Sequence, residues 1–386
     1  MGFRSLQRLL PDESLYRGQE LCQRQMERQW RLQEVQDFEP LADTSVCFLH
    51  NKFLKPVMFK FRYLFHMAAV VLPLMLSGCE QDLDLDRYKN PEMEKMYVVN
   101  SILNPDSVIG VSVTHPFFFS TPHIAFNPVE GLDVQIAGEN GDWENLVYDS
   151  QSKLYLSERR PIAGEVLKLK VNGDVETVLS CDTVPHKVEI ENVEATREGP
   201  IHIYWDTDYR FTYRITFRDT PGEENFYFLA IEDDALPWEF SSMGQVDYTT
   251  DYVFQVLANM INQDVQGWQP DGVFGYPFTD KGIEGELYTI TVSEVLQTPL
   301  VSMIEKLPRR VNLYSISRPY FEYMVSVLAM DYDESALKGN LLSLGLMEPT
   351  KIYSNIEGGA GLMGSYNLST KRVDLLQLTG GWHKNS

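Results

Sequence analysis

The chain has 386 residues, of which 44% are hydrophobic and 12% aromatic, a composition typical of a globular protein and not of a disordered chain. Its 33 lysine and arginine residues are outnumbered by 55 aspartate and glutamate residues, giving a formal net charge of −22 at pH 7. Such an acidic chain is repelled by phosphate backbones, so nucleic acid is not an expected partner.

The stretch from Met58 to Gly78 has the anatomy of a secretory signal peptide. Lys60 and Arg62 form a positive segment, and residues 63–76 form an apolar run of 14 residues. A membrane-spanning helix needs about 20 apolar residues, so a cleaved signal is favoured over a permanent span. Because an export signal is read at the amino terminus, residues 1–57 are interpreted as a leader from a mis-assigned start codon, and are expected to be disordered or absent.

A lipid-attachment motif closes this segment. The tetrapeptide Leu76, Ser77, Gly78, Cys79 resembles the bacterial lipobox, in which the cysteine thiol receives a diacylglycerol before cleavage on its amino side. The sequence therefore predicts that the signal occupies residues 58–78 and that Cys79 anchors the protein to a membrane through acyl chains.

Four acidic residues follow the cysteine at alternating positions within residues 79–95. Such spacing can supply oxygen ligands to calcium, but the glycine turn and distal glutamate of an EF-hand loop are missing. Two other interpretations are a solvated tether and an acidic tag resembling those that send lipoproteins of Bacteroides-like bacteria to the outer face of the outer membrane. The four residues are Glu80, Asp82, Asp84 and Asp86.

Residues 96–185 read as short strands separated by turns. Apolar and polar side chains alternate with a period of two, and no helical segment intervenes. This pattern predicts an antiparallel β-sandwich of immunoglobulin or transthyretin type. The predicted strands cover residues 96–103, 107–114, 132–138, 144–149, 153–157, 165–171 and 176–180.

Residues 186–386 are predicted to form a larger β-rich domain with one packed helix. Ser317 is a favourable N-cap for that helix and Pro319 lies in its first turn. A second helix is considered over 251–262, although its β-branched and aromatic content opposes it. The apolar stripe of the first helix comprises Phe321, Met324, Val325 and Leu328, and strands are predicted over 187–196, 201–206, 211–219, 225–233, 286–295, 351–356, 362–368 and 372–378. The whole chain is thus expected to be mainly β.

Motifs that would name a reaction are missing or lie in the wrong context. The G-x-G-x-x-G sequence at 359–364 is followed by what reads as two strands around a turn, so a glycine bend beside a packed strand is predicted in place of dinucleotide binding. The histidines His115, His123, His186 and His202 are too scattered for a metal site. Cys181 lacks a catalytic partner motif and is predicted to be a small buried side chain. No cofactor is expected.

Two kinds of surface feature carry weaker predictions. Aromatic residues in Pro- and Gly-rich loops are candidates for partner contact or, alternatively, for local core packing. Two Asp-Ser/Thr-aliphatic sequences resemble an O-glycosylation acceptor used by Bacteroides, with Ser107 and Thr183 as acceptors. The candidate contact residues are Phe117, Phe118, Phe119, Trp268 and Tyr276.

Several motifs together resemble a Bacteroidota lipoprotein family known as a domain of unknown function, numbered forty-two forty-nine. The resemblance covers about 300 residues and implies no catalytic or ligand residues. It does imply a genomic context, because such genes commonly neighbour TonB-dependent outer-membrane receptors. The matching segments are the lipobox with its acidic follow-on and residues 97–100, 183–185, 219–227, 278–280 with 285, 317–323 and 353–359.

The leading hypothesis is a surface-exposed outer-membrane lipoprotein that serves as a non-catalytic accessory or ligand-binding partner of a TonB-dependent nutrient uptake system. One alternative is a surface hydrolase acting on glycan or peptide, which would need carboxylates that converge in space. Another is a structural or adhesive surface protein. The expected partners are the membrane and a TonB-dependent receptor, with the ligand unknown.

Overall fold

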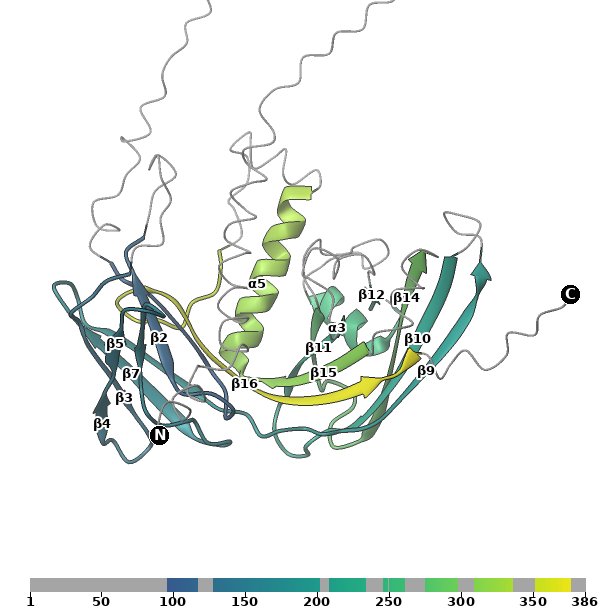
Figure 1. The fold of residues 1–386 in the computed structure, drawn as a ribbon, viewed down its shortest axis with the longest axis horizontal. Coiled ribbons are helices and arrows are strands. Elements are labelled where there is room, and N and C mark those ends of the chain that lie inside the picture. Colours follow the sequence, from purple (N-terminus) through teal and green to yellow (C-terminus); the bar gives the residue numbers. More distant parts are fainter. Residues whose placement is uncertain are drawn as a thin grey trace, which may run out of the picture.

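The computed structural model describes residues 96–116, 128–201, 208–233, 246–248, 250–260, 275–297, 309–335 and 351–375. Strands dominate these residues, so the prediction of a mainly β protein is confirmed. The strands form one eight-stranded and two four-stranded sheets, and Figure 1 shows a sandwich on one side and a curved second region on the other.

The first region is a sandwich of two facing layers. Its strands are β1 (Val98–Leu103), β2 (Gly110–Thr114), β3 (Asp133–Ala137), β4 (Trp143–Asn145), β5 (Val147–Asp149), β6 (Leu154–Leu156), β7 (Val166–Asn172) and β8 (Val178–Thr183). One layer has the order β4-β3-β7-β8, and the other, β1-β2-β6-β5, ends the eight-stranded sheet. Both layers contribute to one core, with Val99 and Val111 from one side and Ile136 and Leu169 from the other.

The segment predicted as a single strand over 144–149 is two strands in different layers. β4 pairs with β3, whereas β5 pairs with β6. Leu146, between them, is buried, and its N–H donates to the Val134 carbonyl at 2.8 Å. The chain changes layer at this residue without a turn, and therefore without a turn signal in the sequence.

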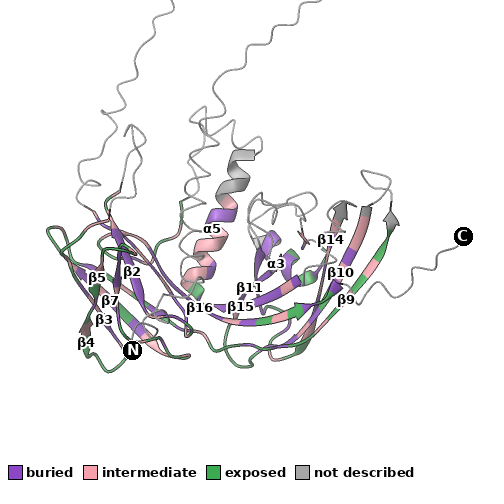
Figure 2. Ribbon diagram, in the orientation of Figure 1, coloured by how far each residue is buried: buried purple, intermediate pink, exposed green. Residues whose placement is uncertain are grey.

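The second region encloses a separate core between two sheets. Its strands are β9 (Ile190–Ile201), β10 (Asp208–Arg218), β11 (Phe226–Asp233), β12 (Val246–Asp247), β13 (Gly275–Thr279), β14 (Leu287–Gln297), β15 (Arg309–Ile316) and β16 (Ala360–Val373). The sheet β12-β14-β10-β9 packs against β13-β11-β15-β16, the other part of the eight-stranded sheet. Figure 2 shows buried residues on β11 and β15 and on the short helix beside them.

That short helix, α3 (Tyr252–Met260), is the one considered from the sequence over 251–262. Asp251 caps it, because its Oδ1 accepts the Val253 N–H at 3.3 Å. Val253, Phe254 and Leu257 are buried in the second core, so tertiary packing outweighs the poor helix propensity of the segment.

The predicted packed helix is α5 (Arg318–Ser335), which rises from the sheet in Figure 1. The Ser317 carbonyl accepts the Phe321 N–H at 2.9 Å and so begins the helix. Phe321 and Leu328 of the predicted stripe are buried, and the helix contacts β16, β11 and β13. The prediction of a helix packed on the sheet is confirmed, but the helix rises from the sheet and does not lie across it.

β16 joins the two regions. Residues Ala360 to Ser365 pair in parallel with β1, while residues Tyr366 to Val373 pair antiparallel with β15. In Figure 1 the strand runs beneath α5 from the sandwich towards β9. The eight-stranded sheet is therefore continuous through both regions.

Two predictions about this carboxyl-terminal part are wrong. The segments 362–368 and 372–378 were predicted as two strands around a turn, but a single strand runs through Val373. The polar residues taken for a turn form hydrogen bonds with other strands. Ser369 Oγ accepts the N–H of Ile190 in β9 at 2.9 Å, and Thr370 Oγ1 donates to Oδ1 of Asn312 in β15 at 2.8 Å. The segment 351–356 is irregular because the Asn355 side chain, not a strand partner, bonds to the backbone of its neighbour in β16.

The glycines at 359–364 serve close packing of β16 on β1. Gly361 has a φ of 114°, and a Cβ there would lie 2.0 Å from the Val99 carbonyl oxygen. Only glycine allows the two backbones to approach in this way. The predicted glycine bend is present, and the motif lies in a strand pairing and not at a helix N-terminus.

Candidate functional site

The predicted lipid anchor lies outside the described residues. This holds for Cys79, for Leu76, Ser77 and Gly78, and for the acidic residues Glu80, Asp82, Asp84 and Asp86. It holds equally for Phe117, Phe118, Phe119 and Trp268 among the candidate contact residues. All of these assignments remain predictions.

Tyr276, the remaining candidate contact residue, belongs to the core. It lies in β13 and is 3% exposed. Its ring packs edge-on against Phe254, with centroids 5.4 Å apart, and beside Tyr248 at 5.7 Å. The expectation of an exposed contact loop is wrong at this residue because α3 covers the strand.

The two candidate glycosylation acceptors differ in accessibility. Ser107 is buried, and its Oγ accepts a hydrogen bond from Asn104 Nδ2 at 2.8 Å. Ser107 is therefore closed to a glycosyltransferase in the folded protein. Thr183 is exposed at the end of β8, although its neighbours Asp182 and Val184 are buried. Glycosylation stays a prediction for Thr183.

Cys181 is exposed, so the prediction of a buried side chain is wrong. In β8 the side chains of Val178 and Asp182 point into the protein, and residues at odd positions point outward. The phase of the strand, not the preference of cysteine for burial, determines the exposure of this thiol.

The arrangement closest to a catalytic carboxylate pair is formed by Asp219 and Asp280, which are 1% and 3% exposed. Asp219 Oδ1 accepts the Tyr227 hydroxyl at 2.5 Å, and its Oδ2 accepts the Gly285 N–H at 2.7 Å. Asp280 Oδ2 accepts the Asn225 N–H at 2.7 Å. The two aspartates connect the turn after β10 with the turn after β13.

Burial is the main cause of the raised pKa values of Asp280 and Tyr227. Desolvation, with a smaller contribution from the negative charge of Asp219, raises the pKa of Asp280. The pKa of Tyr227 is raised by burial and by its hydrogen bond to Asp219, so the phenol remains protonated. Because backbone N–H groups and a phenol occupy three of the four carboxylate oxygens, the pair is built to hold two turns together.

A second polar cluster lies inside the core of the second region. Glu294 of β14 and Arg309 of β15 form an ion pair at 3.0 Å, and Tyr213 donates its hydroxyl to Glu294 at 2.5 Å. Burial and the neighbouring glutamate raise the pKa of Tyr213 well above its ordinary value. The cluster bridges the two sheets and neutralises two buried charges.

A related ladder of polar side chains crosses the opposite face of β15. Arg310 and Asn312 donate to Glu232 of β11 at 3.0 and 3.1 Å. Thr370 of β16 donates to Asn312 Oδ1 at 2.8 Å. These bonds fix the register of three neighbouring strands.

Asp182 connects the sandwich to the second region. Ser365 of β16 donates its hydroxyl to Asp182 Oδ2 at 2.6 Å, and Ser317, at the start of α5, also bonds to this carboxylate. Burial raises the pKa of Asp182 from 3.8 to about 6, against the opposing effect of these hydrogen bonds. No described histidine, lysine or cysteine accompanies the two serines as a base or nucleophile among the contacts of this carboxylate.

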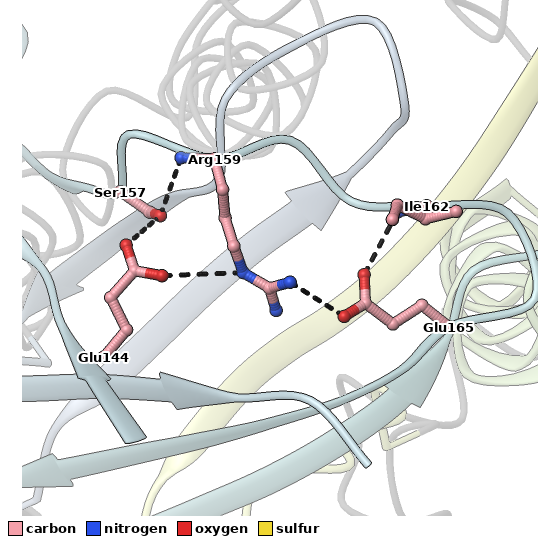
Figure 3. Close-up of polar contacts among 5 residues, drawn as sticks. All are labelled: Glu144, Ser157, Arg159, Ile162 and Glu165. Atoms are coloured by element: carbon pink, nitrogen blue, oxygen red, sulfur yellow. Dashed lines mark hydrogen bonds and ion pairs between the residues drawn. The ribbon is translucent and has the colours of Figure 1, made fainter. Parts of the chain in front are cut away.

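An arginine between two glutamates ties the layers of the sandwich together (Figure 3). Arg159 lies 3.5 Å from Glu144 and 2.8 Å from Glu165, and Glu144 also accepts the Ser157 hydroxyl. Glu165 in turn accepts the Ile162 N–H at 3.1 Å. Because Glu144 lies on β4 and Ser157 follows β6, the network spans both sheets.

The described part of the chain holds no group of three or more His, Cys, Asp or Glu side chains arranged to bind a metal ion. Its helices include none that is long and apolar enough to cross a membrane.

Comparison with protein families matches residues 80–372 to one described as a domain of unknown function, DUF4249. The chain belongs to this family. The match confirms the resemblance to this domain-of-unknown-function family, and it includes both β regions and the acidic residues after Cys79. The comparison with curated proteins found no match.

Sequence reasoning did not single out Glu294 and Arg309, although one signal was present. In β14, Ile290, Val292 and Glu294 occupy alternate positions, so the glutamate falls on the buried face of its strand. A carboxylate at such a position requires a buried partner. Asp219 and Asp280 appeared among the family motifs, but without a role.

Proposed function

We propose that the protein is a lipid-anchored lipoprotein of the outer membrane, exposed at the cell surface, and a non-catalytic accessory or ligand-binding partner of a TonB-dependent nutrient uptake system. The observation that carries the proposal is the lipobox at residues 76–79 followed by four acids, directly before a β-rich body. The family resemblance adds the association with TonB-dependent receptors.

The placement of β1 supports a tethered role. Val98, the first residue of β1, lies 19 positions after Cys79. A fully extended chain of that length spans at most about 65 Å. An anchor at Cys79 would therefore keep the start of β1 within about 65 Å of the membrane, within reach of a neighbouring receptor.

The use of the buried carboxylates supports a non-catalytic role. Asp219, Asp280, Asp182 and Glu294 each accept hydrogen bonds from backbone or side-chain groups that link separate elements. These hydrogen bonds account for the burial of the four carboxylates without a bound substrate. The hydrolase alternative retains one favourable observation, the raised pKa of Asp280 beside Asp219.

The anchor is tested by fractionating cells that express the full chain or its Cys79→Ala variant. We expect the native chain in the outer-membrane fraction and the variant in soluble fractions. Cys181→Ala is the matched control, since it removes an exposed thiol without touching the lipobox, and it should fractionate like the native chain. Retention of Cys79→Ala at the membrane would overturn the anchor.

The accessory role is tested by mild detergent extraction of the tagged native protein and identification of co-purifying proteins by mass spectrometry. Recovery of one TonB-dependent receptor in near-equal amount supports the proposal. Recovery of the protein alone contradicts it. In that case, hydrolysis of surface glycans and peptides would be assayed with Asp280→Asn as the comparison, since loss of hydrolysis in that variant would establish the hydrolase alternative.

A further inference from the structure

The outward face of the sheet β4-β3-β7-β8 carries an ordered set of side chains that the fold does not use. Strand register places Trp143, Ala137, Lys168 and Cys181 in one cross-strand row. The adjacent row comprises Asn145, Gln135, Lys170 and Leu179. The inward side chains of the same strands form the sandwich core, so these two rows face away from it.

This face is open. Trp143 is 41% exposed and Leu179 is 42% exposed, and Lys168 and Cys181 are also exposed. Ala137, between Trp143 and Lys168, is 1% exposed, so neighbouring side chains cover this position of the row.

The aromatic ring and a cation are already positioned together. Lys170 Nζ lies 4.5 Å from the centroid of the Trp143 ring. Next to them, Gln135 Nε2 donates to Asn145 Oδ1 at 2.8 Å, while Gln135 Oε1 is buried and has no hydrogen-bond partner in the described residues. Within those residues neither Lys168 nor Lys170 forms an ion pair.

Charge selects the class of ligand. The chain has a net charge of −22, yet the centre of this face presents two lysines and no carboxylate, and Asp133, in the next row, is bonded to Asn172. Charge-assisted hydrogen bonds from lysine favour anionic groups, among them carboxylates. The acids Glu139 and Asp142 lie in the turn that joins β3 to β4, at one end of the face.

Shape selects the same class. A pyranose ring presents C–H groups on one face, which pack on an aromatic ring, and hydroxyl groups at its edge, which bond to amides and ammonium groups. Trp143 and Lys168 are two strands apart, about 10 Å, a span that two linked pyranose rings cover. We infer that this face, defined by Trp143, Lys168, Lys170, Gln135 and Asn145, binds an acidic polysaccharide whose sugars carry carboxylate groups.

In this arrangement one sugar ring lies on Trp143 and the carboxylate of a neighbouring sugar lies between the two lysines. The inference deepens the proposed function by naming the ligand class that the accessory holds at the cell surface. It is independent of the receptor, because binding is measured on the purified protein, whereas the receptor is detected by co-purification.

The test uses the full chain purified in a zwitterionic detergent and run in native gels that contain polygalacturonate, alginate or hyaluronate, with affinities from calorimetry. Methyl-esterified polygalacturonate, which keeps the sugar backbone but lacks the charge, is the ligand control. We expect retardation by at least one carboxylate polymer and a loss of affinity of about tenfold in Trp143→Ala and in the double variant Lys168→Gln, Lys170→Gln.

Trp143→Tyr keeps an aromatic ring and should retain most of the affinity. The matched controls are Tyr252→Ala and Lys187→Gln, an exposed aromatic and an exposed lysine elsewhere, which should bind like the native chain. Unchanged urea midpoints verify that each variant is folded, and since all the substituted side chains are on the surface they should shift stability little.

Three outcomes would overturn the inference: no binding to any of the three polymers, binding that the Trp143 and lysine variants leave intact, or equal binding to the methyl ester. Binding only to vesicles that contain phosphatidylglycerol would also overturn it and would assign the face to a membrane surface. None of these results bears on the lipid anchor, which is tested by fractionation, or on the association with a receptor, which is tested by co-purification.

Discussion

Glu294 and Arg309 form an ion pair at 3.0 Å with side chains that are only 1% and 4% exposed. The glutamate belongs to the sheet β12-β14-β10-β9 and the arginine to the eight-stranded sheet, so the pair crosses the core between them. Tyr213 bonds to the other oxygen of the carboxylate. Each charge is stabilised by its partner, because an unpaired charge at this buried position would have no water to solvate it.

Replacing Arg309 by methionine is expected to lower the free energy of unfolding by about 3–5 kcal/mol, since it leaves Glu294 buried and uncompensated. The measurement is urea unfolding followed by tryptophan fluorescence. Arg210→Met is the matched control, because its pair with Glu198 is on the surface, where loss costs about 0–1 kcal/mol. Equal effects in the two variants would contradict the structural role of the buried pair.

The contact of β16 with β1 gives a second prediction. Gly361→Ala forces an alanine into a positive φ, a strain of about 1–3 kcal/mol, and also drives its Cβ against the Val99 carbonyl. Gly141→Ala is the control, because Gly141 has a φ of 82° with nothing within 4 Å of its Cβ. The unfolding free energy should fall further in Gly361→Ala, and a fall no larger than in the control would show that the two strands are not in close contact.

Asp182 gives a prediction about pH. Its pKa is raised from 3.8 to about 6 in the folded protein, so the folded state holds a proton that the unfolded state releases. The contribution of Asp182 to the unfolding free energy is therefore fully present below pH 3.8 and is lost as the pH rises towards 6. This change amounts to up to about 3 kcal/mol.

The variant Asp182→Asn removes this titration. As the pH rises from 4 to 6.5, the unfolding free energy of the native chain should fall relative to that of the variant. Urea unfolding of both proteins at each pH measures this difference. Other carboxyl groups titrate in both proteins and cancel in this difference. A constant difference across the range would mean that Asp182 has an ordinary pKa.

The exposure of Cys181 gives a chemical prediction. In the native chain, a maleimide should label Cys181 at the rate of an accessible thiol, without denaturant. Peptide mapping by mass spectrometry identifies the labelled cysteine, and Cys181→Ser is the control for the assignment. Labelling that requires urea would restore the original expectation of a buried thiol.

Local patterns predicted much of the secondary structure. The period-two alternation located the strands of the sandwich, and the stripe containing Phe321 and Leu328 located α5, because these signals come from neighbours a few residues apart. The same patterns failed at Leu146, where the chain passes between layers without breaking the alternation. They also failed at Ser369 and Thr370, whose polar side chains form hydrogen bonds with β9 and β15.

The polar clusters were harder to predict, because their members are far apart in the chain. Asp182 and Ser365 are 183 positions apart, and Tyr213 and Glu294 are 81 apart. Patterns among neighbouring residues in the sequence do not indicate contacts over such distances. Even the error at Cys181 has this origin in part, since the phase of β8 is fixed by its pairing with β7.

The parallel pairing of β1 with β16 has a consequence for how the protein is made. Asn100 accepts the backbone N–H of Leu362, 262 positions later. Among the strands of the described residues, β1 is synthesised first and β16 last, so the sandwich has an open flank until β16 has been made. The sandwich should therefore fold slowly and only after β16 has been made, and a truncation before residue 360 should destabilise the sandwich as well as the second region.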